Sequence, residues 1–209
     1  VWIANAGEDT VSKWDTSTNK EVARYNTWFQ IPDHGVWSGP SPSRICVDAE
    51  GNCYVANRHF DGLQTDVIKI LADDWIDRNG NGIMDTCIDL NDDGTIDATE
   101  LAPFQMVDNN SANNRIDAAE IRDEKVGWVV SVGPADGLGR SLSIDPDGNL
   151  WLGLYNSRKY YKLSKEDGSV LAGPYPVGSH RPYGSLVDKH GYLWSASQGS
   201  NLLKLNTLD

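Results

Sequence analysis

The chain has few basic residues, few phenylalanines and no long apolar run. Its 209 residues include 18 Lys and Arg against 30 Asp and Glu, which gives a formal net charge of −12. A chain of this charge lacks the basic face of a typical nucleic-acid-binding protein. No apolar run reaches the roughly 18 residues that a transmembrane helix needs, so we expect no membrane span. With 3 Phe against 8 Trp and 20 Gly, the composition favours many short strands joined by tight turns.

The acidic residues are concentrated in one quarter of the chain. Between Ala72 and Glu124 there are 14 acidic and three basic residues, a net charge of −11, whereas the remainder, with 16 acidic and 15 basic residues, is almost neutral. A block of like charge is usually a solvated or disordered segment. The spacing of these acids indicates a metal-binding insert instead.

Three segments repeat the same predicted hairpin, at residues 45–57, 142–153 and 185–196. In each, a short alternating strand leads to an Asp, a glycine turn and a second strand that carries an aromatic residue. The Asp side chain favours the turn by bonding to nearby backbone, and Gly adopts the positive φ that the turn requires. The repetition indicates one structural unit that is used several times.

A third predicted strand follows each aromatic residue, and a unit at the start of the chain shares this pattern. A Lys in that strand lies 10 or 11 residues after the aromatic residue in three units and 15 residues after it in the other. A fourth strand is predicted at residues 21–25, 127–131 and 169–172. The aromatic and Lys residues are Trp2 with Lys13, Tyr54 with Lys69, Trp151 with Lys162, and Trp194 with Lys204.

Four-stranded units of about 40 to 45 residues are typical of β-propeller blades, and Trp151 and Trp194 lie 43 residues apart. We therefore predict an all-β chain with about four propeller blades. A β-sandwich is the alternative, but a sandwich requires no such period. The predicted units contain three, four, four and three strands, so we expect an arc of a larger ring rather than a closed ring of four. Strands from further chain or from another subunit would complete it.

The strongest motif is the segment 89–100, which matches the twelve-residue EF-hand calcium loop at each diagnostic position. Gly94 permits the sharp turn at position 6. Hard oxygen ligands in a flexible shell favour Ca²⁺ over Mg²⁺ or Zn²⁺. The alternative is an acidic turn without metal. The expected ligands, at positions 1, 3, 5, 7, 9 and 12, are Asp89, Asn91, Asp93, Thr95 through its backbone carbonyl, Asp97 and Glu100.

Two weaker loops flank this second loop. The first loop, 77–88, has Ile88 at position 12, which cannot ligate, although Asp89 is adjacent. The third loop, 109–120, lacks acids at positions 1, 3 and 5, and Asn114 replaces the glycine; Asp108 adjoins its first position. Fewer charged ligands predict weaker binding. Position 7 ligates through its backbone carbonyl, so its side chain is free to vary. The expected ligands are Asp77, Asn79, Asn81, Ile83 (position 7) and Asp85 in the first loop, and Asn109, Ser111, Asn113, Arg115 (position 7), Asp117 and Glu120 in the third.

Together the three loops form a predicted EF-hand-like insert at residues 77–124, which we call the acidic insert. It divides the propeller into residues 1–76, with blades 1 and 2, and residues 125–209, with the end of blade 2 and blades 3 and 4. Ile96 and Ile116 both occupy position 8 of their loops, and in a paired EF-hand they would form a short bridge. Residues 98–101 and 118–122 are each expected to form about one helical turn.

The hairpins resemble those of known propeller families. Residues 1–15 resemble the repeat of YVTN-type propellers, in which a Val-Ala-Asn strand leads to a Thr-Val-Ser strand and an Asp-Thr turn. The Asp-x-x-Gly-Asn-Leu-Trp hairpins resemble NHL-type and streptogramin-lyase-like propellers. The resemblance covers about three quarters of the chain, all but the acidic insert, which is itself similar to a dockerin-like or EF-hand-like pair. It implies the fold and carries over no catalytic residue, because the histidine and acid pair of the lyases has no recognisable counterpart.

Cysteine and aromatic residues leave alternatives open. Cys46 and Cys53 lie on facing strands of one predicted hairpin and are candidates for a cross-strand disulfide; a bridge to Cys87, or three buried thiols, are the alternatives. The recurring Trp position is expected to pack between blades, with a carbohydrate-stacking surface as the alternative.

Two histidines are candidates for general bases. His34 and His180 precede predicted blades, where they could act as general bases, although solvated loop histidines are the simpler interpretation. His190 lies in a hairpin turn and is expected to be exposed.

The sequence therefore predicts a non-catalytic, extracellular or cell-surface binding or structural module that is stabilised by calcium. Weak calcium loops suit millimolar calcium, which favours a secreted or surface location. Calcium ions, another protein or a surface polymer are the expected partners. The alternatives are a propeller lyase or hydrolase of the streptogramin-lyase-like type, and a subunit of a surface filament or layer that assembles with itself.

Overall fold

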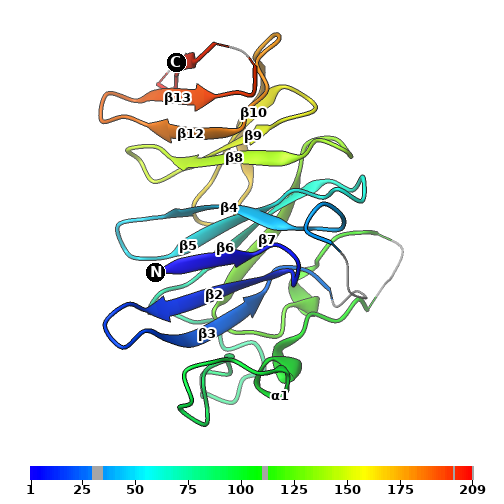
Figure 1. Ribbon diagram of the computed structural model, residues 1–209, viewed down its shortest axis with the longest axis vertical. Helices are drawn as coiled ribbons and strands as arrows, with labels where there is room; N and C mark the ends of the chain where they lie inside the picture. Colours follow the sequence, from blue (N-terminus) through cyan, green and yellow to red (C-terminus); the bar gives the residue numbers. More distant parts are fainter. Residues whose placement is uncertain (30–34, 110–112, 200, 209) are drawn as a thin grey trace.

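Four antiparallel sheets follow one another along the chain in the computed structural model, which describes residues 1–29, 35–109, 113–199 and 201–208 (Figure 1). We number them blades 1 to 4 in chain order; they contain three, four, four and three strands, as predicted. Within each blade every strand pairs with its neighbour in sequence. The all-β prediction is confirmed. The strands are β1 (Trp2–Asn5), β2 (Thr10–Asp15), β3 (Lys20–Asn26), β4 (Pro42–Val47), β5 (Cys53–Asn57), β6 (Thr65–Ile70), β7 (Val126–Val132), β8 (Gly139–Ile144), β9 (Leu150–Leu154), β10 (Lys159–Leu163), β11 (Val170–Pro176), β12 (Gly184–Val187), β13 (Tyr192–Ala196) and β14 (Leu203–Asn206).

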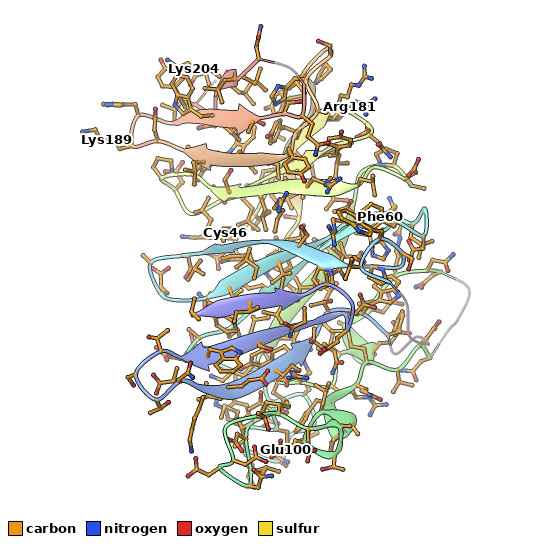
Figure 2. All side chains as sticks on the ribbon, in the orientation of Figure 1. Cys46, Phe60, Glu100, Arg181, Lys189 and Lys204 are labelled. Atoms are coloured by element: carbon orange, nitrogen blue, oxygen red, sulfur yellow. The ribbon has the colours of Figure 1, made fainter. Side chains whose placement is uncertain are left out.

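The two ends of the blades carry different connections, because antiparallel strands reverse direction at each turn. The Asp-Gly turns that join β4 to β5, β8 to β9 and β12 to β13 lie at one end, the turn end. The β5–β6, β9–β10 and β13–β14 loops and the connections between blades lie at the other, the loop end. In Figure 2, Lys189 marks the turn end, and Phe60 and Arg181 mark the loop end. Strand β8 packs against both β4 and β12, so neighbouring blades meet along their first strands.

The recurring Asp has two roles in each turn. In blade 3, Asp145 accepts hydrogen bonds from the backbone N–H groups of Asp147 (3.0 Å) and Asn149 (2.9 Å), and Gly148 adopts a φ of +86°. Its second carboxylate oxygen accepts from Trp151 Nε1 at 3.2 Å. The equivalent bonds join Tyr54 to Asp48 and Trp194 to Asp188. The Asp side chain therefore fixes both the turn and the aromatic ring two residues into the next strand.

The spacing between aromatic and Lys residues is explained by strand register. In all four blades the aromatic residue lies directly opposite the Lys on the neighbouring strand. The ammonium groups lie 5.1 to 5.8 Å from the ring centroids, within the range of a cation–π interaction. Tyr54 and Trp151 are fully buried, as packing between blades requires, whereas Trp194 is 38% exposed. The interblade packing prediction is confirmed for these two buried rings.

Three apolar clusters hold the blades together. The largest includes Val11 and Tyr25 of blade 1, Val55 and Ile68 of blade 2, and residues of the acidic insert such as Ile116. The second joins blades 2 and 3, and the third joins blades 3 and 4. The core therefore lies between consecutive blades, which is the arrangement of a propeller rather than of two stacked sheets.

Of the three alternatives for the cysteines, the candidate disulfide between Cys46 and Cys53 is not formed: both residues, and Cys87, are free thiols. In the β4–β5 ladder Cys46 lies opposite Tyr54, and Cys53 lies opposite Val47. Because successive residues of a strand point to opposite faces of the sheet, Cys46 and Cys53 belong to different faces. Burial raises the pKa of all three thiols, that of Cys87 to about 12.

The acidic insert leaves blade 2 after β6 and returns at β7, but it packs on blade 1. Its only regular elements in the described residues are α1 (Ala98–Leu101) and two 3₁₀ turns, η1 (Ala102–Phe104) and η2 (Ala118–Glu120). Figure 1 shows this segment beside β3, the outer strand of blade 1. The backbone N–H of Glu21 donates to the carbonyl of Gly94 at 3.0 Å. The insert thus covers a strand edge that would otherwise be open to pairing.

Candidate metal centre

The second loop is folded by its own oxygen atoms. Asp89, at the first position, accepts hydrogen bonds from the backbone N–H groups of Asp93 (3.2 Å) and Gly94 (2.8 Å). Asn91 and Asp93 each accept a hydrogen bond from the backbone N–H two residues further on. Gly94 has a φ of +90°, which a residue with a side chain would adopt only with strain. The backbone therefore has the turn that the motif predicts.

A buried glutamate closes this second loop. Glu100 Oε1 accepts a hydrogen bond from the backbone N–H of Leu90 (2.7 Å), and its Oε2 accepts one from Asp97 (3.0 Å). Asp97 in turn caps α1 by accepting from the N–H groups of Thr99 and Glu100, which forms a capping box. Glu100 is only 6% exposed. One carboxylate therefore joins the second and ninth positions of the loop.

The first loop has the same internal pattern. Asp77 accepts hydrogen bonds from the backbone N–H groups of Gly80 (2.7 Å), Asn81 (3.2 Å) and Gly82 (3.0 Å). Asn79 accepts from Asn81, and Asn81 accepts from Ile83. The first loop therefore has the same turn as the second loop.

The closing glutamate of the first loop was missed by the sequence analysis. Ile88 stands at its twelfth position, but Glu124 Oε1 accepts a hydrogen bond from the backbone N–H of Arg78 and its Oε2 accepts one from Asp85, both at 2.8 Å. These bonds match those of Glu100 at the second and ninth positions of its own loop. Glu124 is 1% exposed. The carboxylate absent from the motif is therefore supplied where the insert returns to blade 2.

The third loop is also closed by a buried glutamate, with a shifted first position. Glu120 Oε1 accepts from the backbone N–H of Asn109 and its Oε2 accepts from Asp117, both at 2.8 Å. Asn109 thus takes the place that Leu90 has in the second loop. The first position falls on Asp108, not on Asn109 as predicted, and the third loop has one extra residue.

The remaining predicted residues of the third loop are only partly described. Asn113 accepts a hydrogen bond from the backbone N–H of Arg115 at 3.0 Å. Asn114 adopts a φ of +53°, which replaces the glycine conformation of the other loops. Ser111 lies outside the described residues.

The predicted bridge between Ile96 and Ile116 is not present. Both side chains are buried, but the one isolated β-bridge among the described residues joins Phe29 to Met106. The backbone N–H of Ile96 instead donates to the carboxylate of Glu21 at 3.2 Å. The second loop is therefore held by the edge of blade 1 rather than by the third loop.

The oxygen atoms that would bind a divalent cation accept hydrogen bonds from neighbouring side chains in this structure. In the described residues, no three His, Cys, Asp or Glu side chains are gathered into a metal-binding group. The amide nitrogens of Asn79 (2.6 Å) and Asn81 (2.8 Å) contact Asp85, that of Asn91 contacts Asp93 (3.1 Å), and that of Asn113 contacts Asp117 (2.9 Å). The Thr95 hydroxyl likewise bonds Asp93. Each loop has the donor types that calcium takes, and the cation would replace these amide contacts.

Two of the described histidines, His59 and His180, are buried and hydrogen-bonded. His59 is fully buried between Asp61 (3.0 Å) and Asp66 (2.6 Å). Burial lowers the pKa of His59, but the hydrogen bonds to the two carboxylates outweigh it and raise the pKa to about 9. His180 is 6% exposed, and its Nε2 lies 2.8 Å from Ser195 Oγ, an atom that also accepts from the Tyr160 hydroxyl. His190 is exposed at the turn end, as predicted, and His34 lies outside the described residues.

Comparison with solved structures settles the fold. A catalytically inactive virginiamycin B lyase of Staphylococcus aureus with quinupristin matches with a TM-score of 0.50 and 9% identity, over 98% of this chain and 51% of that one. A gluconolactonase of Xanthomonas campestris matches with a TM-score of 0.52 and 13% identity, over 99% and 55%. A β-propeller domain from Myceliophteria thermophila matches with a TM-score of 0.52 and 9% identity, over 95% and 46%. The chain has a β-propeller fold.

These likenesses are of fold alone. No protein-family model and no curated protein sequence matches the chain. The propeller described here spans about half the length of the solved structures it matches. No helix of the described residues is both long enough and apolar enough to cross a membrane.

Proposed function

We propose that the chain belongs to a secreted or cell-surface β-propeller that acts as a non-catalytic binding or structural module, with an acidic insert that calcium holds in place. The observation that carries the proposal is the repeated glutamate closure of the three loops, by Glu100, Glu120 and Glu124. All three carboxylates are at least 94% buried in an insert with a large excess of negative charge. Buried like charges repel one another unless a cation compensates them.

Calcium would supply that compensation and link the ends of each loop. The carboxylate and amide oxygens of the second loop, with the Thr95 carbonyl and Glu100, make up a calcium ligand set. In the first loop Glu124 takes the part of the missing twelfth ligand. Because the described part of the insert has only short helical turns and the insert carries a large excess of negative charge, much of its folding energy would come from binding the ion.

The test is calcium titration of the purified chain after treatment with EGTA. Isothermal titration calorimetry should show calcium binding with three sites, the second being the tightest because it has most carboxylate ligands. Scanning calorimetry should show a higher melting temperature in calcium, since a ligand at 100 times its Kd stabilises by about 2.7 kcal/mol. Mg²⁺ at the same concentration serves as the control. Identical melting curves with calcium and with EGTA would contradict the proposal.

A lyase or hydrolase is the second candidate function. The fold likeness to a lyase and a gluconolactonase fits it, and the contact between His180 and Ser195 offers a base beside a hydroxyl. However, Ser195 is fully buried, so a substrate would not reach its hydroxyl. Hydrolysis of lactone substrates that is abolished by His180→Gln, with folding intact, would favour the enzyme over the binding module.

Self-assembly into a surface filament or layer is the third candidate. Strands β1 and β14 each have one neighbour in their sheets, and such strand edges pair readily with other chains. Sedimentation velocity over a range of protein concentrations distinguishes this candidate, which requires growing oligomers.

A further inference from the structure

Three arginines meet between blades 2 and 3, towards the loop end; we call Arg44, Arg58 and Arg140 the arginine cluster. Arg44 lies on β4 and Arg140 lies on β8, the first strands of neighbouring blades. Arg58 follows β5 directly. The Nε of Arg44 donates to the backbone carbonyls of Arg140 (2.8 Å) and Tyr183 (3.0 Å), so the residue links blades 2, 3 and 4. The cluster is therefore part of the rigid framework rather than of a loop.

In the part of the chain that the structure describes, no carboxylate balances these three guanidinium groups. Among the described residues none of them forms an ion pair, although the chain has 30 acidic residues. Arg58 donates to the carbonyls of Ser41 (3.0 Å) and Val36 (3.1 Å). Arg140 is 8% exposed and its buried Nε has no hydrogen-bond partner. A buried cation without an anion is costly unless a ligand completes it.

The pKa shifts of the cluster also indicate that its positive charges lack compensation. Burial, together with repulsion from Arg140 and Arg44, lowers the pKa of Arg58 to about 10. Burial lowers the pKa of Arg44 as well, and Arg140 contributes to the shift. Mutual repulsion of this kind is relieved when an anion sits among the guanidinium groups.

Four aromatic rings wall the cluster. Arg58 lies 4.9 Å from the Phe60 ring centroid and 5.4 Å from that of Trp37, and Arg140 lies 4.6 Å from the Tyr183 ring. Tyr155 lies 5.3 Å from Arg140 and also contacts Arg181. The aromatic faces hold the guanidinium planes in place.

Trp37 differs from the other rings because it is 67% exposed. A large ring exposed beside a cationic cluster offers a flat surface for stacking. The cluster and Trp37 thus combine charge recognition with a face that suits a ring.

We propose that the arginine cluster binds an oxyanion, either a carboxylate or a sulfate, carried on a sugar ring that stacks against Trp37. Planar guanidinium groups bind such oxyanions through two parallel hydrogen bonds. The proposal rests on the role of the chain as a binding module and names the chemical class of its ligand. It requires no calcium.

Isothermal titration calorimetry with sodium glucuronate, glucose and sodium sulfate tests the proposal. The affinity for glucuronate should be at least about tenfold higher than that for glucose, because one charge-assisted hydrogen bond accounts for a factor of that size. Arg44→Gln and Arg140→Gln should each weaken glucuronate and sulfate by a similar factor. Trp37→Ala should weaken glucuronate and leave sulfate unchanged. Arg122→Gln, at an exposed arginine of the acidic insert, is the matched control and should change neither.

Three results would overturn the proposal. The first is equal affinity for glucuronate and glucose, and the second is no binding of glucuronate or sulfate. The third is full affinity in Arg44→Gln and Arg140→Gln chains whose circular dichroism is native. If those variants do not fold, the exposed Trp37→Ala decides, because unchanged glucuronate affinity would refute stacking. Repeating the titrations in EGTA separates this outcome from failure of calcium binding, which the melting curves report independently.

Discussion

The blades and the acidic insert are stabilised by different interactions. The blades bury apolar side chains between sheets in a fixed strand register, and rings such as Trp151 are almost fully enclosed. The insert has little regular structure, and its loops are closed by carboxylates that accept backbone hydrogen bonds. The blades therefore depend mainly on hydrophobic burial, which needs no partner. The insert also contributes apolar residues to the core beside blade 1, but under the proposed function it would in addition depend on a cation that compensates its charge. One chain would then combine a part whose stability is its own with a part whose stability depends on the solution.

The largest expected effect is on a blade. Trp151→Ala removes a ring that is 1% exposed and should lower the free energy of unfolding by about 3 to 5 kcal/mol, with or without calcium. Urea unfolding in calcium and in EGTA measures the loss. Trp194→Ala is the matched control, because the same repeat position is 38% exposed there and a smaller loss is expected. A loss for Trp151→Ala that appears only in calcium would break the distinction between blades and insert.

The next largest effect is a pH dependence of the free energy of unfolding, which arises from His59 of blade 2. The pKa of His59 is raised to about 9 in the folded state, against about 6.5 when unfolded. Its stabilising contribution is therefore present in full below pH 6.5 and is lost as pH rises through 9, by about 3 kcal/mol in total. Urea unfolding at pH 6, 7.5 and 9.5 measures this loss.

His59→Gln is the control for the pH series, because it removes the titrating group. Its free energy of unfolding should change less between pH 6.5 and 9 than that of the parent chain. Equal slopes in the two proteins would assign the pH dependence to other groups.

A smaller effect is expected at the insert. Glu124→Gln loses one of two carboxylate contacts and should destabilise the metal-free chain by about 1 to 2 kcal/mol. In calcium it should also reduce the number of bound ions by one, as measured by calorimetry. Glu166→Gln, at an exposed glutamate of blade 3, should change neither quantity. Unchanged stoichiometry in Glu124→Gln would remove this residue from the first loop's ligand set.

The smallest effect concerns the contact between the two parts. Lys20 of β3 pairs with Asp92 at 2.6 Å, but the Asp92 side chain is 88% exposed. Exposed ion pairs contribute little, so Lys20→Gln should cost less than about 1 kcal/mol, and added salt should reduce the difference further. A larger cost in thermal unfolding would show that the ion pair, and not the backbone contacts, fixes the insert to blade 1.

Local patterns were enough to predict the blades. The Asp-Gly turns and the aromatic and Lys spacing specify adjacent strands, and the helical turn at Ala98–Leu101 follows from the loop motif. Pairings between distant residues were not predictable, because nothing in the motif of the first loop points to Glu124, 47 residues after Asp77. The acid pair Asp123 and Glu124 beside the return to blade 2 was the only signal.

Two further features needed the coordinates. The sequence could not choose between a Cys46–Cys53 disulfide and free thiols, because hairpin membership does not specify which face of the sheet a residue occupies; that depends on register. The arginine cluster combines residues from different blades and connections, each of which reads as an ordinary surface arginine in the sequence. Whether a charged side chain has a partner of opposite charge depends on the folded structure, so it could not be predicted from the sequence.

The contact between Glu21 and Gly94 has a consequence for how copies of this chain meet. Where ions are scarce, release of the insert would uncover the outer strand of blade 1, whose free amide and carbonyl groups can template a foreign strand. A lower calcium concentration would then promote aggregation of the chains through this edge, and a higher concentration would prevent it. Under the proposed function, the insert would act as a calcium-dependent cover over the exposed edge of blade 1.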